Sequence, residues 1–510
     1  MPILNWLNKD EAVTTSKKCT YRLLEEVPEL SYGDADNENL LIQGDNLEAL
    51  KALIPHYAGK VKCIFIDPPY NTRSAFEHYD DNLEHSQWLS MIYPRLELLR
   101  ELLSEDGSIW ITLDDSEMHY CKVISDEVFG RNNFIASMVW EKRKTRENRR
   151  VFSFNHDHIL VYAKNKPKFE AVRNPLPMTD EIRKRYKNPD NDPRGDWQSI
   201  SALAQAGHGT ASQFYTLITP GGKEVEPPKG NCWRYSKAKM IQEIDDNRIW
   251  FGKDGNNAPR IKKFLSESED NGVTPETLWK ADEVGTTDTA KKHVNTVLDN
   301  VTFDTPKPEE LLHRIIHIAT NTNDLILDSF SGSGTTGAVA HKMNRRWLMV
   351  EIGDHARSHI VPRLKKVTDG EDEGGVSQAL NWTGGGGFRF YKLGEAVFNE
   401  YGCLNTNIKF PTLASHIWYL ETKTPLGNKA DTPLLGVHND TAYYLLYNGI
   451  LGDRRPAGGN VLTSKVLNNL PDIDKHERIV IYGESSRLGE ARLKQANITF
   501  KQIPYDVGTL

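Results

Sequence analysis

Short apolar segments that alternate with amphipathic ones, in two blocks separated by a long irregular stretch, constrain the fold of this chain most. In the first block, residues 39–43, 61–66 and 108–113 are apolar runs of strand length. Leu47 and the leucines that follow it recur at helical spacing, and residues 86–103 form a longer stretch with one apolar face. Strands that alternate with helices predict a mostly parallel α/β sheet, which binds ligands at the carboxyl ends of its strands.

The rest of the chain divides by the same pattern. We expect further helices at residues 116–129, 308–320 and 337–343. We expect further strands at residues 134–141, 157–163, 324–328 and 346–351. The stretch between the two blocks is rich in Pro, Gly, Asn and charge, and it is too long for a loop. The predicted parts are an irregular N-terminal arm (1–35), the first half of the sheet domain (36–164), an inserted domain (165–300), the second half of the sheet domain (301–394) and, beyond a hinge of four consecutive glycines, a smaller C-terminal α/β domain (395–510).

Composition excludes several classes of protein. The chain has 510 residues, enough for several domains, with 38% hydrophobic and 26% charged residues, as in globular proteins. No apolar run approaches the ~18 residues of a membrane span, and the N-terminus lacks the pattern of a secretion signal, so we expect a cytoplasmic protein without membrane contact. The five cysteines are scattered without CxxC spacing, which predicts no metal site.

The first motif with chemical meaning is DPPY, residues 67–70, directly after the apolar run VKCIFI. Two prolines make a backbone turn rigid and remove N–H donors, so the Asp67 carboxylate and the Pro68 carbonyl are left as fixed acceptors for an amine. Pro69 completes the turn, and the ring of Tyr70 offers a surface on which a nucleobase can stack. Four residues recur often by chance, and a plain strand-ending turn is the alternative interpretation.

The second motif spans Asp328–Thr336 and carries Phe330, Gly332 and Gly334 in an FxGxG arrangement between a predicted strand and helix. Glycines at this point allow a ligand to approach the backbone at a helix N-terminus, where Thr335 also lies. Because Gly337 completes G-x-G-x-x-G, a dinucleotide loop fits as well. Glu351, at the end of the next strand, suits ribose hydroxyls of NAD or of S-adenosylmethionine alike.

A basic run follows the strand at 134–141, with six basic residues and one acidic residue in nine positions. Its basic residues are Lys142, Arg143, Lys144, Arg146, Arg149 and Arg150. A solvated loop is the ordinary interpretation of such a run. Its place between two strands beside the DPPY motif makes phosphate contact an equal alternative, although the net charge of the chain is -7.

The stretches DPPYNT, AFEHYDDNLEHSQWLSMIYPRLELLRELLSEDGSIWITLDD, EVFGRNNFIASMVWEK and HDHILVYAKN, and later TPKPEELLHRII, DSFSGSGTT and GGGGFRFYKLG, carry a family likeness. The order of the two motifs resembles the β-group of DNA amino-methyltransferases. The stretches are similar to the modification subunits of type III restriction–modification systems, from about residue 40 to 395. The resemblance implies a circularly permuted, Rossmann-like, S-adenosylmethionine-dependent methyltransferase sheet with an inserted target-recognition domain.

The resemblance also implies roles for single residues. Asp45 would meet the adenine ring of the cofactor, and Phe330, Gly332 and Gly334 would line its methionine and ribose portion. Glu351 would bind the ribose hydroxyls. Lys307, in TPKP, would meet the cofactor carboxylate, although a plain lysine at a helix N-terminus is an equal alternative. Asp328 and Thr335 complete the predicted cofactor site.

The expected activity is methylation of adenine N6 in double-stranded DNA, on a base flipped out of the duplex and without a metal. The resemblance further implies a homodimer and a helicase–endonuclease restriction subunit as partner. Alternatives are N4-cytosine methylation, an adenine methyltransferase without a restriction partner, a DNA-binding specificity subunit with an inactive site, and an NAD-dependent dehydrogenase. The expected activity requires Asp67 and the loop around Gly332 to share one pocket.

Overall fold

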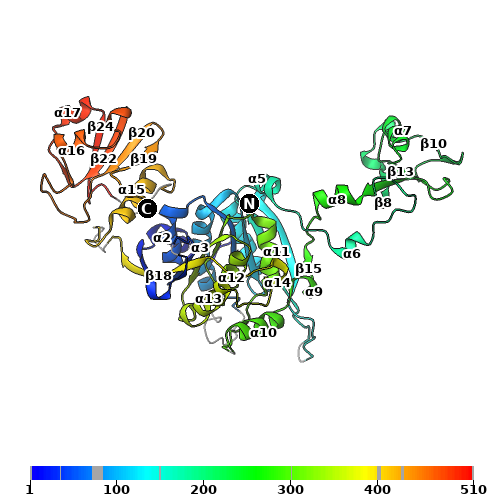
Figure 1. Cartoon of the computed structure of the whole chain (residues 1–510), viewed down its shortest axis with the longest axis horizontal. Coiled ribbons are helices and arrows are strands. Elements are labelled where there is room, and N and C mark those ends of the chain that lie inside the picture. Colours follow the sequence, from blue (N-terminus) through cyan, green and yellow to red (C-terminus); the bar gives the residue numbers. More distant parts are fainter. Residues whose placement is uncertain are drawn as a thin grey trace. The chain divides into compact units, whose positions relative to one another are not determined.

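The computed structural model describes residues 3–34, 36–71, 84–148, 151–299, 301–398, 404–426 and 430–507. The chain divides into two compact units. The main unit comprises Met1–Asn174 and Glu276–Leu510, and the inserted unit comprises Pro175–Pro275. Figure 1 labels the elements of both units.

One mixed sheet organises the main unit. From one edge to the other its strands are β1 (Arg22–Glu26), β18 (Gly387–Ala396), β3 (Leu40–Gln43), β17 (Arg346–Glu351), β16 (Leu325–Asp328), β4 (Val61–Ile66), β5 (Leu103–Leu113), β7 (His156–Ala163), β6 (Phe134–Glu141) and β15 (Leu278–Trp279), with β2 (Tyr32–Gly33) paired to β18. The strands from β18 to β5 run parallel, and β7 is antiparallel to both of its neighbours. The mostly parallel α/β sheet that the sequence predicts is therefore confirmed.

Strands β16 and β4 are the two that matter most for the site. They are parallel neighbours, with Ile326 opposite Cys63 and Leu327 opposite Ile64, although about 260 residues separate them in the chain. Both end at the same edge of the sheet, where parallel α/β sheets bind ligands. The DPPY turn follows β4, and the glycine loop follows β16, so the fold brings the two motifs together.

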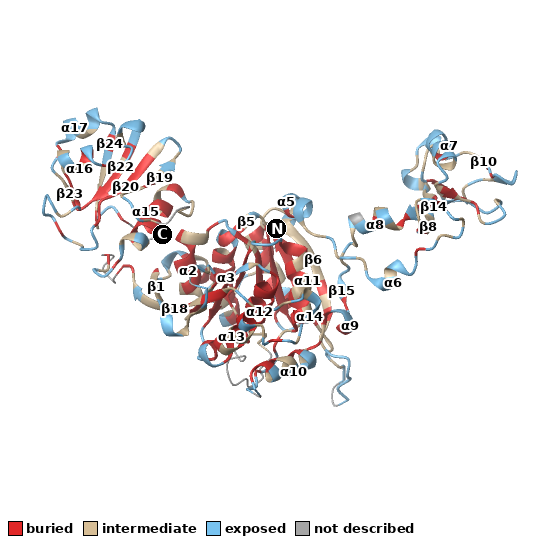
Figure 2. Cartoon of the chain, in the orientation of Figure 1, coloured by how far each residue is buried: buried red, intermediate tan, exposed pale blue. Residues whose placement is uncertain are grey.

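Helices cover the sheet. The helices of the main unit that precede the C-terminal segment are α1 (Lys9–Lys18), α2 (Asn46–Tyr57), α3 (His85–Leu102), α4 (Met118–Ser125), α5 (Lys166–Val172), α9 (Ala281–Val284), α10 (Thr287–Val297), α11 (Glu309–Ala319), α12 (Thr335–Lys342), α13 (Val361–Asp369) and α14 (Ser377–Leu380). Trp88, Ile92, Leu96 and Leu99 of α3 are buried on one face, as their spacing predicts. Each such side chain contributes roughly 1.5–3 kcal/mol by leaving water. Figure 2 shows this buried core along the sheet.

The N-terminal segment differs from the irregular arm that we expected. Helix α1 packs on α3, where the Ser16 hydroxyl donates to Glu97 over 2.7 Å, and Lys9 pairs with Glu127 at 2.7 Å. Only a narrow face of α1, with Ala12 and Ser16, is buried. Such a short and mostly polar helix has no apolar stripe by which sequence periodicity could reveal it.

The four glycines at 384–387 do not act as the hinge that we expected. Gly387 already begins β18, which pairs in parallel with β3 inside the main sheet, and the Gly385 N–H donates to the Thr368 carbonyl over 2.7 Å. The C-terminal residues beyond β18 share a buried cluster with Tyr21 and Ala52, so they belong to the main unit. The predicted hinge was wrong because runs of glycine also occur where backbones pack closely: a Cβ at Gly384 would lie 2.8 Å from the Gly370 nitrogen.

The C-terminal segment forms a smaller α/β layer, as predicted. Its sheet has the order β19-β20-β22-β24, in which β20, β22 and β24 are parallel. Its elements are α15 (Phe410–Thr422), β19 (Leu434–His438), β20 (Thr441–Leu445), β21 (Val461–Leu462), α16 (Ser464–Asn468), β22 (Arg478–Gly483), β23 (Ser485–Ser486), α17 (Glu490–Gln495) and β24 (Ile498–Gln502). The Tyr419 hydroxyl on α15 donates to Glu101, which joins this layer to α3.

The inserted unit is narrower than the predicted range of 165–300. Helix α5 before it, and β15, α9 and α10 after it, belong to the main unit. Its own elements are α6 (Asp180–Arg183), β8 (Trp197–Ser201), β9 (Leu203–Gln205), β10 (Leu217–Ile218), β11 (Glu224–Val225), β12 (Asn231–Trp233), α7 (Lys237–Asp245), β13 (Ile249–Trp250), β14 (Arg260–Phe264) and α8 (Leu265–Asn271). In the described part of the chain, no helix combines the length and the apolar character that crossing a bilayer demands.

Candidate active site

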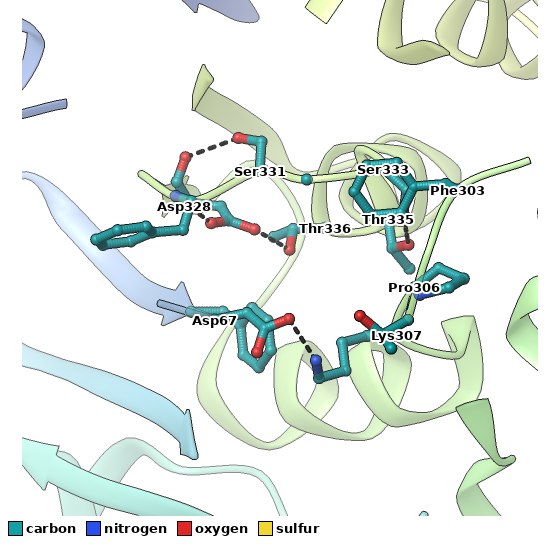
Figure 3. Close-up of a pocket in the computed structure, with 13 residues that line it drawn as sticks. Asp67, Phe303, Pro306, Lys307, Asp328, Ser331, Ser333, Thr335 and Thr336 are labelled. Carbon is teal, nitrogen blue, oxygen red and sulfur yellow. Dashed lines mark hydrogen bonds and ion pairs between the residues drawn. The ribbon is translucent and has the colours of Figure 1, made fainter. Parts of the chain in front are cut away.

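One pocket brings the two sequence motifs together. It is lined by Phe65, Asp67, Phe303, Thr305, Pro306, Lys307, Asp328, Phe330, Ser331, Gly332, Ser333, Thr335 and Thr336. Asp67 follows β4, and Asp328 ends β16, so the pocket opens at the carboxyl edge of the sheet. Figure 3 shows Asp67 and Lys307 on one side and the loop with Asp328 and Ser331 on the other. The requirement that Asp67 and the loop around Gly332 share a pocket is met.

The two carboxylate oxygens of Asp67 have different environments. Oδ2 forms an ion pair with the Lys307 Nζ. Oδ1 is buried and has no hydrogen-bond partner among the described residues. Burial raises the pKa of Asp67, and the Lys307 charge opposes that rise. A buried acceptor without a partner is costly, so its persistence beside a pocket indicates a ligand that donates to it.

The rest of the DPPY turn is held from outside the pocket. The indole Nε1 of the buried Trp88 donates to the Pro69 carbonyl over 2.7 Å. The Tyr70 hydroxyl lies 3.2 Å from the Thr112 hydroxyl and donates to Asp157 over 3.3 Å. Burial and the nearby carboxylates raise the pKa of Tyr70 well above its usual value, so its ring remains neutral. Among the described residues, nothing donates to the Pro68 carbonyl, which leaves it available to a ligand.

The glycine loop has a backbone that other residue types rarely adopt. Gly332 has a φ of 54°, and Gly334, the residue before α12, has a φ of 77°. A Cβ at Gly334 would lie 2.9 Å from Cγ2 of Ile360, so side-chain packing also requires glycine there. The loop thus presents its backbone at the start of a helix, where N–H groups favour electron-rich ligand atoms.

Buried carboxylates hold this loop. Glu351 accepts from the Gly332 N–H over 2.7 Å and from the Gly353 N–H over 3.1 Å. Asp328 accepts from the Phe330 N–H over 2.9 Å and from the Thr336 hydroxyl. Burial raises the pKa of Asp328 to about 7. Glu351 does not line the pocket, so in this structure it supports the loop, while its predicted contact with ribose hydroxyls stays a prediction.

Asp45 lies apart from the pocket lining. It caps α2 by accepting from the Leu47 N–H over 2.8 Å, and it pairs with Arg95 at 2.9 Å. The next residue links this turn to the glycine loop, because the Asn46 amide donates to the Ser329 carbonyl over 2.7 Å. The predicted contact of Asp45 with a cofactor therefore stays a prediction, in a turn that adjoins the loop.

Sequence reasoning missed the residues that support the loop from behind. Arg363, fully buried, donates to the Thr335 hydroxyl over 2.9 Å and to the Ser333 carbonyl over 3.1 Å. It also pairs with Glu309 at 2.9 Å. Glu309 binds Lys342 at 2.8 Å as part of the same buried network. The available signal was a glutamate and a lysine on the apolar faces of the helices at 308–320 and 337–343.

The predicted basic run divides into two groups. Lys142 pairs with the buried Asp157 at 2.6 Å, and Lys144 pairs with Asp282. Arg143 and Arg146 are exposed, and neither has an ion-pair partner among the described residues. Arg149 and Arg150 lie outside the described residues.

This chain matches known proteins in sequence and in structure. Residues 61–361 match the model of the DNA methylase family. The chain is 31% identical over 376 residues to the Mod subunit of the type III restriction-modification enzyme StyLTI of Salmonella typhimurium, which covers 67% of this chain and 56% of the relative. It is 31% identical over 421 residues to the probable type III enzyme HindVI Mod subunit of Haemophilus influenzae, with 71% and 54% covered.

The chain thus spans little more than half the length of these two relatives. Among solved structures, the complex of M1.HpyAVI with S-adenosylmethionine matches with a TM-score of 0.31 and 16% identity, covering 64% of this chain and 99% of that one. The match to the family model includes β4 with the DPPY turn and β16 with the glycine loop, which line the pocket together. The chain belongs to the DNA methylase family.

Proposed function

We propose that this chain transfers a methyl group from S-adenosylmethionine to N6 of an adenine flipped out of double-stranded DNA. The observation that carries the proposal is the buried Oδ1 of Asp67, which has no partner among the described residues and lies in the pocket that the glycine loop also lines. An exocyclic amine donates two hydrogen bonds, and Asp67 Oδ1 and the Pro68 carbonyl are two acceptors on one rigid turn.

The two acceptors would change the nucleophilicity of the amine. The lone pair of adenine N6 is delocalised into the ring, so the free amine is a poor nucleophile. When Asp67 and Pro68 hold its two hydrogens, the nitrogen becomes more pyramidal and its lone pair is localised. Burial raises the pKa of Asp67, and the charge of the Lys307 Nζ opposes that rise, so Lys307 favours the ionised form of the carboxyl group. Asp67 is then the base that is placed to take the proton released by the amine.

The pocket residues fit the proposed cofactor. Phe303 and Phe330 offer apolar rings, and Lys307 offers a cation. When bound, S-adenosylmethionine supplies a methyl group on a positively charged sulfur, which leaves as a neutral thioether. The glycine loop would hold the donor in line with the amine, and such positioning contributes much of the acceleration.

Adenine is favoured over cytosine because the tetrapeptide begins with aspartate, whereas enzymes that methylate cytosine N4 more often begin it with serine. The test is direct. The purified chain is incubated with unmethylated DNA and S-adenosylmethionine, and the digested nucleosides are identified by mass spectrometry. We expect N6-methyladenine. N4-methylcytosine would replace the proposal by the cytosine alternative, and no methylated nucleoside would reject it.

We further propose that the chain is the modification subunit of a type III restriction–modification system. The support is its identity to two relatives that are named as Mod subunits of such systems. The inserted unit would then recognise the target sequence, a helicase–endonuclease subunit would be a partner, and the chain would form a homodimer in the cytoplasm. Co-purification of a restriction subunit from the source cell would support this, and activity with no such partner would favour a stand-alone enzyme.

A further inference from the structure

The loop between β6 and β7, residues 142–155, begins and ends beside the proposed catalytic turn. Asp157, at the start of β7, accepts from the Tyr70 hydroxyl and from Lys142. The Lys142 Nζ also lies 6.0 Å from the centre of the Tyr70 ring. Both ends of this loop are therefore anchored beside Tyr70.

The stem of the loop is braced. The Asn155 amide donates to the Arg143 carbonyl and to the Thr145 carbonyl, both over 3.0 Å. Nearer the tip, the Ser153 hydroxyl accepts from the Glu147 N–H over 2.9 Å. These cross-loop bonds and the two lysine pairs fix the stem, so its tip is presented without a large loss of conformational entropy on binding.

Two apolar side chains near the tip of the loop face water. Val151 is 93% exposed and Phe152 is 75% exposed. Figure 2 shows most of the described loop between β6 and β7 coloured as exposed. Large apolar side chains in solvent at the tip of a braced loop indicate a binding surface, because folding gains nothing from exposing them.

The charges around the tip indicate the kind of partner. Lys142 and Lys144 are neutralised by carboxylates of the main unit, whereas Arg143 and Arg146 are exposed without an ion-pair partner among the described residues. Apolar side chains flanked by exposed guanidinium groups match a nucleic-acid duplex, which offers phosphates outside and stacked bases inside. An apolar protein partner would not require the cations.

The reach of the loop matches the geometry of base flipping. Phe152 lies five residues before Asp157 in the chain, so an extended chain spans at most ~17 Å between them. When a base leaves the duplex and reaches the DPPY turn, the gap that it leaves in the base stack lies within a comparable distance of that turn. Apolar side chains of DNA-bending proteins enter such places and compensate for lost stacking.

We propose that Val151 and Phe152 form a wedge that enters the base stack beside the flipped adenine, while Arg143 and Arg146 bind the flanking phosphates. This inference rests on the proposed function, since it assigns the loop to the same reaction. It makes Phe152 a positioning residue that acts on the duplex, not on the methyl transfer itself.

The test compares Phe152→Ala with the unaltered full chain on two DNA substrates. One is a duplex with the target adenine paired normally, and the other has an abasic site opposite that adenine, which removes its pairing partner. We expect the variant to lose about 10-fold or more in kcat/KM on the paired duplex. On the abasic duplex, where less work is needed to extrude the base, we expect it to remain within about 3-fold of the unaltered chain.

Two further variants sharpen the test. Tyr505→Ala removes an aromatic side chain of matching exposure, 74%, from the C-terminal layer, and it should behave as the unaltered chain on both substrates. Phe152→Leu keeps an apolar wedge and should recover most of the activity on the paired duplex. Equal losses on the two substrates, or no loss on either, would overturn the wedge.

Other outcomes separate the proposals. If Phe152→Ala alters the oligomeric state and leaves methylation of the paired duplex unchanged, the tip is a protein contact and the wedge is wrong. If the unaltered chain methylates neither substrate, the proposed function fails before the wedge is tested. Binding of S-adenosylmethionine should be the same in all variants, because the loop does not line the pocket.

Discussion

The two strand ends that form the pocket are built in opposite ways. After β4, the DPPY turn leaves polar atoms open: Asp67 Oδ1 is buried without a partner among the described residues. After β16, buried side chains hold the glycine loop: Glu351 accepts from the Gly332 N–H, and Arg363 donates to the Thr335 hydroxyl, while the buried Ser329 hydroxyl has no partner among the described residues. We call the end of β4 unsaturated, because its acceptor has no partner among the described residues, and the end of β16 saturated, because buried side chains hold its backbone.

This difference separates two tasks. A saturated loop keeps one shape whether or not a ligand is present, which favours a site that binds the same molecule in every cycle. An unsaturated acceptor is costly in the free protein and gains its partner only from the molecule on which it acts. The pocket therefore combines a preformed cofactor side with a reactive side, and substitutions on the two sides should have different effects.

The largest effect should come from the unsaturated side. Asp67→Ala should lower kcat for methyl transfer about 1,000-fold, roughly 4 kcal/mol, because it removes the acceptor that activates the amine. Binding of S-adenosylmethionine, measured by calorimetry, should change little, since the glycine loop stays intact. Methylation at a normal rate would break the assignment of Asp67.

A matched control exists for this substitution. Asp106 also pairs with a lysine, Lys62, at 2.5 Å, but it lies away from the pocket. Asp106→Ala removes the same kind of ion pair and should leave kcat unchanged. A similar loss in both variants would show that breaking a lysine pair, and not loss of the acceptor, explains the result.

On the saturated side, Arg363→Met should reduce stability more than activity per folded molecule. It leaves the fully buried Glu309 with one cationic partner and removes three hydrogen bonds to the loop, so we expect a loss of about 3 kcal/mol in the free energy of unfolding. Urea denaturation measures it. Arg346→Met, which breaks a surface pair with Glu38, should change that free energy by less than about 0.5 kcal/mol. Equal losses of unfolding free energy in the two variants would mean that Arg363 supports the saturated loop no more than a surface arginine does.

The sequence predicted the sheet well because its signals are local. The run VKCIFI before Asp67 and the run DLILD before the glycine loop are strands in the structure, at residues 61–66 and 325–328. Sequence alone also placed both motifs at strand ends, and strand ends of a parallel sheet meet at one edge. The shared pocket follows from these two facts.

Partners of single side chains were not predictable, because they depend on contacts between distant segments. Lys307 was expected to meet a cofactor, and in the structure it pairs with Asp67, 240 residues away. Nothing near Arg363 in the sequence indicates that it binds Ser333 and Thr335. Helix α1 was missed for a different reason: its buried face is too narrow to give a periodic signal.

A smaller effect is expected where the saturated loop depends on backbone shape. Gly334→Ala places a Cβ 2.9 Å from Ile360 at a φ of 77°, so we expect a loss of about 2 kcal/mol in stability, together with weaker binding of S-adenosylmethionine. Gly59→Ala is the control, because Gly59 has a φ of 70° and nothing within 4 Å of the added Cβ. It should cost only the backbone part, about 1 kcal/mol. Thermal denaturation and calorimetry check both, and equal losses would show that the loop has room to adjust.

The smallest effect is a pH dependence carried by Asp328, the buried carboxyl group that anchors the saturated loop. Burial raises its pKa from 3.8 to about 7, so the folded protein keeps a proton that the unfolded chain releases near pH 4. Unfolding therefore releases a proton between about pH 4 and pH 7, and the contribution of Asp328 to stability falls as the pH rises through that window.

Asp328→Asn isolates this contribution. The amide does not titrate, and its oxygen can still accept from the Phe330 N–H. Between pH 6 and pH 7, the free energy of unfolding should fall by about 1 kcal/mol more in the unaltered chain than in the variant. Denaturant titrations at the two pH values measure the difference. An equal fall in the two proteins would mean that Asp328 is ionised throughout, and the saturated loop would then carry a buried charge that its hydrogen bonds alone must stabilise.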